Sequence, residues 1–428
     1  MPFDVLYSRF EIRVTFVFIR TTSEFLSKGA EIAAIWQGLH YSCPAFAYKL
    51  ISGGIMIYFD NSATSRYKPK KMLDEMVKEL SDSANGGRSA HGDALKTALK
   101  ISSCRSVLCD YLNANEIIFT KNCTEAINIV LFGILKHGDH VVTTVTEHNA
   151  VLRPLFALEK AGVITLSVIN PDRNLKINPC HVAKTIKENT ALVALNAVSN
   201  VTGVINDFEK IGRIAAERKV PLLLDAAQAL PHVKINMKAQ NISYLAGAGH
   251  KGLHGPQGTG FLALNKMSDI NPLIYGGTGT NSDSVYQPHN LPESLEAGTL
   301  NAAGIVGLCE SVKWTIKNAD KINAKISRLS GRLMFALKNM RNVEVYTPVG
   351  VDTGVISFNV KDADSTTVAD ILDKKYGIAV RAGLHCAPLI HNHLGTLEKG
   401  AVRISVGYNN KNADVEKLID AIREISKS

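Results

Sequence analysis

The chain has 428 residues, of which 46% are hydrophobic and 20% are charged, a balance typical of a globular protein with a large core. Its formal net charge is +9, but Lys and Arg are scattered, which favours a solvated basic surface over nucleic-acid binding. The basic balance would also suit anionic ligands. No apolar run approaches the roughly 18 residues of a membrane span. Seven widely spaced cysteines without a CxxC pair predict a reduced, cytoplasmic protein with neither a disulfide framework nor a structural zinc site.

Residues 1–55 differ from the rest of the chain, because they show no alternation of strand and helix patterns. Met56 then opens MIYFDNSATSRYKPK, which predicts a short extended segment, an Asx turn and a helix entered through a proline. We therefore expect Met56 to be the true start and 1–55 to be an extension that need not belong to the native protein. A native protein whose mass includes residues near position 1 would contradict this hypothesis.

The middle of the chain alternates apolar runs with helical segments such as 208–219. The runs predict buried strands at 116–120, 140–145, 163–169, 191–198 and 220–227. Strands alternating with helices predict an α/β fold with a mostly parallel, doubly wound sheet. Such sheets bind ligands at the carboxyl ends of their strands, so the residues that follow each strand are the candidates for a site.

The rest of the chain predicts a smaller α+β domain. Its expected elements are a long helix, two short strands and a helix between those strands, at 311–340, 355–360, 401–406 and 365–377. We expect a large domain over 75–310 and a small domain built from 56–74 together with 311–428.

Useful side chains follow several of the predicted strands. Thr124 opens a helix, where a hydroxyl and free N–H groups suit a phosphate, although a plain N-cap is the commoner explanation. Taken alone, His148 and Asn200 indicate only a loop and a turn. Asp225 ends an apolar run, where a carboxylate needs a cation or donors unless it caps a helix, and Gln228 lies three residues further.

A glycine-rich stretch at 244–264 carries Lys251, which directly follows His250. Six glycines within fourteen residues indicate a backbone that passes close to another group or adopts positive φ. A lysine in this setting can be desolvated and made nucleophilic, whereas an ordinary loop lysine is exposed. A further candidate is Cys386 in RAGLHCAP, which by residue type alone could be a buried filler, a metal ligand or a nucleophile.

In combination these residues supply the parts of a pyridoxal phosphate site. A lysine forms the Schiff base, a carboxylate pairs with the protonated ring nitrogen, and an imidazole stacks on the ring. Helix N-terminal amides, hydroxyls and His250 suit the phosphate, while the amides of Asn200 and Gln228 suit the phenolic oxygen. No single motif is specific for this cofactor, but the ordered set is.

The same ordered segments resemble a known family. YFDNSAT, CTEAIN, TEHNA, SNVTG, DAAQ, GHKGLHGPQGTG, EAGTLN and RAGLHCA with RIS occur in the order found in class V aminotransferase-fold enzymes. The chain is most similar to cysteine desulfurases, particularly the group with a short segment around the active cysteine, over residues 56–428. The resemblance implies the fold type I of pyridoxal-phosphate-dependent transferases, pyridoxal 5'-phosphate as cofactor, no metal, and a homodimer with shared active sites.

The resemblance also implies a role for each matching residue. Lys251 would form the Schiff base and act as acid–base catalyst, Asp225 would pair with the ring nitrogen, and His148 would stack on the ring and assist proton transfer. In the family pattern, Thr124, His250 and the amide of Cys123 bind the phosphate, and Asn200 and Gln228 bind the phenolic oxygen. Thr299 reaches the phosphate of the neighbouring subunit. Arg403, with Asn200, binds the substrate carboxylate, and Cys386 is the nucleophile.

The reaction implied by this resemblance converts L-cysteine to L-alanine and leaves the sulfur on Cys386 as a persulfide, with Arg381 and His385 assisting ionisation of the thiol. Only 16 residues separate Cys386 from Arg403, which predicts a thiol held close to the pocket and a sulfur-acceptor or scaffold protein that comes to it. Iron–sulfur cluster assembly, tRNA thiolation and cofactor sulfuration share this first step. Ala248 departs from the Ser or Thr of many relatives, and the missing hydroxyl would weaken cofactor binding by about 1 kcal/mol.

Alternatives from two classes remain open at this point. A selenocysteine lyase, a class V aminotransferase or another β-lyase of the same fold would use the same pocket, and in a transaminase Cys386 would be incidental. The other class is a non-catalytic protein that holds the cofactor for a regulatory or scaffold role. Absence of alanine production from cysteine, with the cofactor fully bound, would favour that class.

Overall fold

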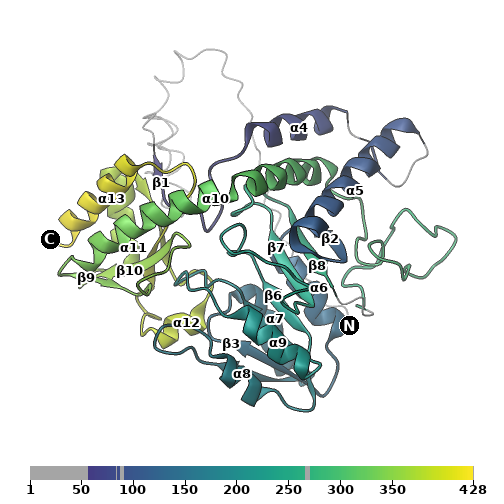
Figure 1. The fold of residues 1–428 in the computed structure, drawn as a ribbon, viewed down its shortest axis with the longest axis horizontal. Helices are drawn as coiled ribbons and strands as arrows, with labels where there is room; N and C mark the ends of the chain where they lie inside the picture. Colours follow the sequence, from purple (N-terminus) through teal and green to yellow (C-terminus); the bar gives the residue numbers. More distant parts are fainter. Residues whose placement is uncertain (1–55, 83, 87–90, 266–269, 428) are drawn as a thin grey trace, which may run out of the picture. The chain divides into compact units, whose positions relative to one another are not determined.

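The computed structural model describes residues 56–82, 84–86, 91–265 and 270–427 (Figure 1). The hypothesis that 1–55 is an extension concerns residues outside these ranges. The first described segment follows the sequence prediction, with strand β1 (Ile57–Tyr58), a turn closed by the bond from Ala63 N to Asp60 O, and helix α4 (Lys70–Ser81) directly after Pro69.

The large sheet has seven strands in the order β2-β8-β7-β6-β5-β3-β4. In that order they are β2 (Glu116–Thr120), β8 (Gly260–Leu264), β7 (Tyr244–Ala248), β6 (Leu222–Asp225), β5 (Thr190–Asn196), β3 (Asp139–Thr144) and β4 (Ile164–Ile169). Strand β8 runs antiparallel to both of its neighbours, and every other pairing is parallel. The predicted mostly parallel sheet is therefore confirmed, with two strands, β7 and β8, inside the glycine-rich stretch.

Helices cover both faces of this sheet. On β2, Ile117 packs in the same core as Leu108 of α5 (Gly92–Leu112), whereas the next residue, Ile118, packs in a separate core with Ile127 of α6 (Cys123–Ile134). Both isoleucines are 0% exposed, so each contributes about 1.5–3 kcal/mol of hydrophobic stabilisation. The helices around the sheet are α5 (Gly92–Leu112), α6 (Cys123–Ile134), α7 (Asn149–Lys160), α8 (Pro179–Thr185) and α9 (Phe208–Glu217). This arrangement confirms the doubly wound architecture.

A smaller antiparallel sheet with the order β12-β13-β10-β9 follows in the chain. The remaining elements are α10 (Ala302–Lys338), β9 (Val343–Val345), β10 (Val355–Val360), α11 (Ser365–Tyr376), β11 (Ile378–Ala379), β12 (Arg381–Gly383), α12 (Pro388–His393), β13 (Ala401–Ser405) and α13 (Asn412–Ile425). Phe358, Ile404 and Leu418 share a core of their own, as expected for an α+β region. Strand β11 pairs in parallel with β1, which ties the start of the described chain to this region.

Helix α10 begins earlier than the sequence predicts. The apolar pattern placed its start at residue 311, but the Asn301 side chain accepts a hydrogen bond from Gly304 N and caps the helix there. Helix α10 therefore crosses the proposed boundary between the large domain, 75–310, and the small domain, and this division stays a prediction. Among the described helices, none is both long enough and apolar enough to span a membrane.

Candidate active site

One cavity of about 220 Å³ lies where the carboxyl ends of the parallel strands in the large sheet meet the small sheet. Ten of the residues predicted from the sequence line it: Cys123, Thr124, His148, Asn200, Asp225, Gln228, His250, Lys251, Cys386 and Arg403. The sequence separates the first from the last of them by 280 positions, yet the fold brings them together because β3, β5 and β6 end at the same edge of the sheet.

Lys251 lies in the tight turn that follows β7. Burial lowers the pKa of its amine, although the Asp225 carboxylate acts in the opposite direction. The lowered pKa increases the fraction of nucleophilic free amine. The glycine density around it reflects close contact, because a Cβ at Gly252 would lie 2.0 Å from the carbonyl oxygen of Leu230. The turn can approach the backbone of Leu230, in the segment after β6, only with glycine at that position.

Asp225 is buried at the end of β6 and holds its carboxylate toward the cavity. Its Oδ1 accepts from Ala227 N at 2.9 Å and from the Cys123 thiol at 3.5 Å. Burial and the nearby carboxylate raise the pKa of the Cys123 thiol well above its ordinary value, so this cysteine stays protonated. Asp225 is thus the anion available to a ring nitrogen, and Cys123 is no nucleophile.

His148 caps helix α7, with its Nδ1 accepting from Ala150 N at 3.0 Å. Burial lowers the pKa of the imidazole to about 4, so the ring is neutral at pH 7 and carries its proton on Nε2. A neutral, fixed imidazole suits stacking on a flat ring. The buried Glu147 beside it accepts from Thr144 Oγ1 and Asn196 N, and burial raises its pKa to about 8. Nothing in the sequence had indicated Glu147.

The start of helix α6 and His250 give the cavity a place that suits an anion. Helix α6 begins at Cys123, and its first N–H groups have no partner within the helix, apart from Glu125 N, which Asn122 caps. The N-terminus of a helix attracts negative charge, and the Thr124 hydroxyl lies in its first turn. Nδ1 of His250 is buried without a hydrogen-bond partner, which is a group that a phosphate oxygen would satisfy.

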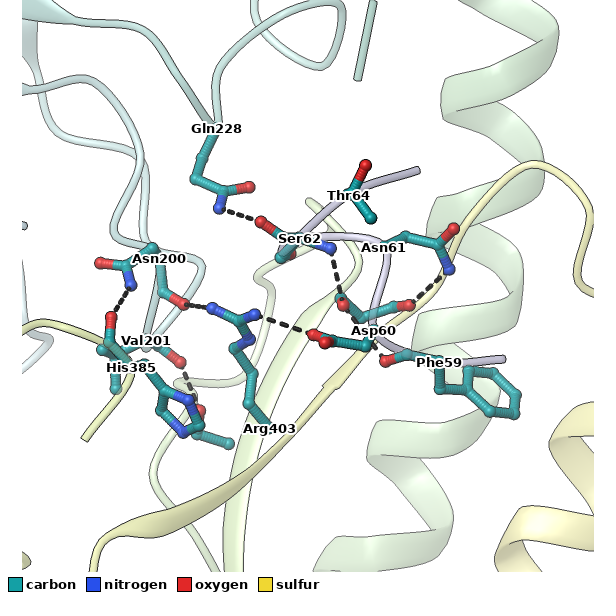
Figure 2. A network of polar contacts seen from close by, with 12 residues as sticks. Phe59, Asp60, Asn61, Ser62, Thr64, Asn200, Val201, Gln228, His385 and Arg403 are labelled. Carbon is teal, nitrogen blue, oxygen red and sulfur yellow. Dashed lines mark hydrogen bonds and ion pairs between the residues drawn. The ribbon is translucent and has the colours of Figure 1, made fainter. Parts of the chain in front are cut away.

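Arg403 lies on β13 with only 2% of its side chain exposed, and its guanidinium connects two other segments (Figure 2). Its Nη1 donates to Asn200 O at 3.1 Å and its Nη2 to Asp60 Oδ1 at 3.0 Å. Nε has no partner in the structure. A buried guanidinium that is oriented on two sides and keeps an unfilled donor suits recognition of a carboxylate. The sequence had given Asp60 no role.

Asn200 and Gln228 each use one amide hydrogen within the protein. Asn200 Nδ2 donates to His385 O at 2.7 Å, and Gln228 Nε2 donates to Ser62 O at 2.9 Å (Figure 2). Each amide nitrogen keeps a second hydrogen for an oxygen of a ligand. The donors, the buried carboxylate and the anion-binding end together fit pyridoxal phosphate.

Cys386 lies on a tight turn whose two central residues are both left-handed, with φ of 50° at His385 and 58° at Cys386. Backbone of this kind is strained for side chains other than glycine, and such strain is found at functional sites. Asn200 holds the carbonyl of His385, and Asn149 N holds the carbonyl of Cys386 at 2.7 Å. The Cys386 side chain lines the cavity and is also exposed to solvent.

His385 does not supply the positive charge that its predicted assistance to Cys386 requires. Its Nε2 is 3.0 Å from the carbonyl oxygen of Ala401, and burial beside Arg403 lowers the pKa of the imidazole to about 2. The ring is therefore neutral at pH 7. Of the two residues expected to assist ionisation, Arg381 lines the cavity as a cation.

Thr299 lies apart from the other predicted residues. It is exposed and lines a second cavity of about 150 Å³ together with Thr120, Lys121 and Gly258. Its predicted contact is with the phosphate of a neighbouring subunit, so that role stays a prediction. Within the described part of the chain, no group of three or more His, Cys, Asp or Glu side chains is arranged to hold a metal ion.

A family model described as aminotransferase class-V matches residues 57–418. The chain therefore belongs to the class V aminotransferase family. The relatives are more specific: a protein of Pyrococcus abyssi named a probable cysteine desulfurase is 36% identical over 386 residues, which cover 87% of this chain and 95% of the relative. A protein of Methanothermobacter thermautotrophicus with the same name is 33% identical over 381 residues, covering 86% and 94%.

A solved structure of a cysteine desulfurase also matches this chain. The fold matches the apo structure of a cysteine desulfurase from Thermococcus onnurineus with a TM-score of 0.81, at 33% identity and with 87% of this chain and 95% of that chain covered. The resemblance predicted from the ordered motifs is thereby confirmed.

Proposed function

We propose that this protein is a cysteine desulfurase, which converts L-cysteine to L-alanine and retains the sulfur as a persulfide on Cys386. The observation that carries the proposal is a single cavity lined by an amine of lowered pKa, a buried arginine with a free donor, and an exposed thiol: Lys251, Arg403 and Cys386. The names of the relatives support the same activity.

The residues that would hold pyridoxal phosphate divide by the part of the cofactor that each one contacts. Asp225 would pair with the ring nitrogen, and His148 would cover the ring. The amides at the start of α6, Thr124 and His250 would bind the phosphate. The cofactor, when bound, supplies an electron-withdrawing ring that stabilises negative charge at the substrate Cα.

Three side chains of the chain would then act on the substrate. Arg403 binds the carboxylate and fixes the position of Cα. Lys251 removes the α-proton and returns a proton during turnover. The Cys386 thiolate attacks the substrate sulfur, so that an S–S bond forms as the Cβ–S bond breaks, and Cβ takes a proton to give alanine. The substrate sulfur gives up the two electrons that reduce Cβ, so no external oxidant is needed.

The exposure of Cys386 supports delivery of the sulfur to another molecule. A persulfide on this turn would be reachable from solvent, which suits an acceptor or scaffold protein that docks over the turn. We also propose a cytoplasmic location, because the six cysteines among the described residues are all free thiols.

A homodimer forms part of the proposal. Helix α4 exposes Leu73, Val77 and Leu80 at 47%, 62% and 60%, spaced so that they share one helix face. Helix α5 exposes Leu95 and Leu99 at 60% and 61%. Apolar side chains on two adjacent helices support burial against a second copy, in which Thr299 could reach the neighbouring pocket.

The first experiment measures alanine and persulfide formation from L-cysteine, with L-selenocysteine in parallel. Wild type is compared with Cys386→Ala and with Cys180→Ala as a matched control, because Cys180 is also an exposed free thiol but does not line the cavity. We expect Cys386→Ala to keep the yellow bound cofactor and lose persulfide formation, and Cys180→Ala to keep both. A Cys386→Ala variant as active as wild type would refute the proposal and make transamination the leading activity.

A further inference from the structure

The segment 60–68 contacts three of the proposed active-site residues, and its residues Ser62 and Ala63 also line the cavity. Asp60 pairs with Arg403, and Ser62 O accepts from Gln228 (Figure 2). The third contact is to the backbone of His250, the residue before Lys251. This segment carries no proposed catalytic residue. It nevertheless contacts Arg403, Gln228 and residues 250–255, which we call the lysine turn.

The carbonyl oxygen of His250 receives four donors from this segment. Ser65 N and Ser65 Oγ both donate at 3.0 Å, while Thr64 Oγ1 and Lys68 Nζ lie at 3.3 Å. A carbonyl oxygen has two lone pairs, so four donors within hydrogen-bond distance more than saturate its capacity to accept. The same carbonyl belongs to the rigid peptide unit that joins His250 to Lys251. Fixing this oxygen fixes the plane from which the Lys251 side chain begins.

Lys68 does more than the other donors, because its ammonium bridges both ends of the lysine turn. Nζ also donates to Gly255 O at 2.6 Å and to Ser65 Oγ at 3.0 Å. Between these ends the turn is closed by bonds from His254 N to Lys251 O and from Gly255 N to Gly249 O. Lys68 thus links the first and last carbonyls of residues 250–255.

The charge of Lys68 has no carboxylate partner among the residues that the structure describes. The side chain is half-buried, and the loss of solvent lowers the pKa of its amine to about 8. Removing a cation from solvent costs free energy, and hydrogen bonds to neutral oxygen atoms offset this cost less than a carboxylate would.

We propose that Lys68 is a positioning residue for Lys251: it holds the 250–255 turn so that the Lys251 amine stays aligned with the substrate Cα. The inference rests on the proposed role of Lys251 as the acid–base lysine. Lys68 does not itself line the cavity, has no hydrogen bond to Arg403, and reaches the cavity-lining residue His250 only through its backbone carbonyl. Its loss should therefore affect proton transfer and leave binding of the substrate carboxylate nearly unchanged.

The test compares Lys68→Met with Lys68→Arg, which keeps donors for the carbonyls. The matched control is Lys325→Met, because Lys325 is also partly buried and its Nζ also donates to a backbone carbonyl, that of Tyr408 at 2.5 Å. The first readout is hydrogen–deuterium exchange of the His254 and Gly255 amides in cofactor-free protein. The second is the division between kcat and KM for L-cysteine after loading with pyridoxal phosphate.

For Lys68→Met we expect exchange at both amides to accelerate about tenfold, kcat to fall about tenfold, and KM to stay within about twofold of wild type. Lys68→Arg should restore most of both quantities, and Lys325→Met should change neither. Should Lys68→Met fail to fold, Lys68→Gln, which keeps one amide donor, should give intermediate exchange and kcat. Exchange and kcat indistinguishable from those of Lys325→Met would overturn the proposal, as would a loss carried by KM alone.

Lys251→Ala separates failure of this inference from failure of the proposed function. If the absorbance of the bound cofactor does not depend on Lys251, the proposed role of that lysine is wrong. Accelerated amide exchange in cofactor-free Lys68→Met would still support Lys68 as the residue that holds the turn. Unchanged exchange would refute it, whatever Lys251 does.

Discussion

At the scale of single residues, Arg403 shows why a buried arginine cannot be exchanged for lysine. The planar guanidinium donates in two directions to Asn200 O and Asp60 Oδ1, and a lysine could not satisfy both while presenting donors to a substrate. We expect Arg403→Lys to raise KM for L-cysteine about 10- to 100-fold, the loss of one charge-assisted hydrogen bond or slightly more, with a smaller change in kcat. Steady-state kinetics measures both quantities.

The control for this prediction is Arg332→Lys. Arg332 also forms a two-pronged pair, with Glu416, but the pair is exposed and remote from the cavity. Its replacement should leave KM unchanged. An Arg403→Lys enzyme with the KM of wild type would show that the carboxylate is bound elsewhere.

The same residues show which parts of the site a sequence can reveal. Asp225 and Asn200 could be predicted because each follows an apolar run, so local pattern places them at one edge of the sheet. Asp60 could not, because its partner Arg403 is 343 positions away and no local pattern encodes that pairing. Glu147 lay next to a predicted residue, but its protonation depends on burial, which appears only after folding.

At the scale of elements, the lysine turn makes a sharp prediction about glycine. A Cβ at Gly252 would lie 2.0 Å from Leu230 O, so the backbone of one segment must move. Gly331 lies exposed within α10 and has no atom within 4 Å of such a Cβ. We expect Gly252→Ala to destabilise the protein by about 1–3 kcal/mol through overpacking, and Gly331→Ala to stabilise it by about 0.5–1 kcal/mol. Urea unfolding measures both.

The opposite signs of these two effects make the comparison decisive. A stability loss in both variants would mean that helix α10 does not tolerate alanine at an exposed position, which its geometry contradicts. An unchanged Gly252→Ala protein would mean that the turn does not pack against Leu230 as tightly as the structure shows.

Some elements are determined by nearby sequence and could be predicted, whereas others depend on contacts that form only in the folded protein. Five of the seven strands of the large sheet could be predicted because each is a short apolar run, as in β6, where Leu222, Leu223 and Leu224 are all fully buried. The other two, β7 and β8, lie in the glycine-rich stretch and were not predicted as strands. The antiparallel insertion of β8 between β2 and β7 could not be predicted, since pairing partners are set by the assembled sheet. The early start of α10 is marked by the cap at Asn301, which the apolar pattern alone did not reveal.

At the scale of the whole molecule, two regions with separate cores build one cavity. The large sheet supplies the proposed cofactor ligands, and β13 with the Cys386 turn supplies the residues proposed to act on the substrate. The segment 60–68 joins them, because it pairs with Arg403 through Asp60 and with the lysine turn through Lys68. The site therefore forms only when the beginning and the end of the described chain fold together.

The proposed homodimer can be tested on helix α4. Val77 is 62% exposed at the centre of the apolar face formed with Leu73 and Leu80. In a twofold dimer each substitution counts twice, and a buried unpaired carboxylate is unfavourable, so Val77→Glu should raise the dimer dissociation constant about 100-fold or more. Val349→Glu is the control, because Val349 is 78% exposed in the turn between β9 and β10. Sedimentation equilibrium of wild type and both variants gives the dissociation constants. A monomeric wild type would refute the dimer, whereas a Val77→Glu protein as dimeric as wild type would place the interface away from α4.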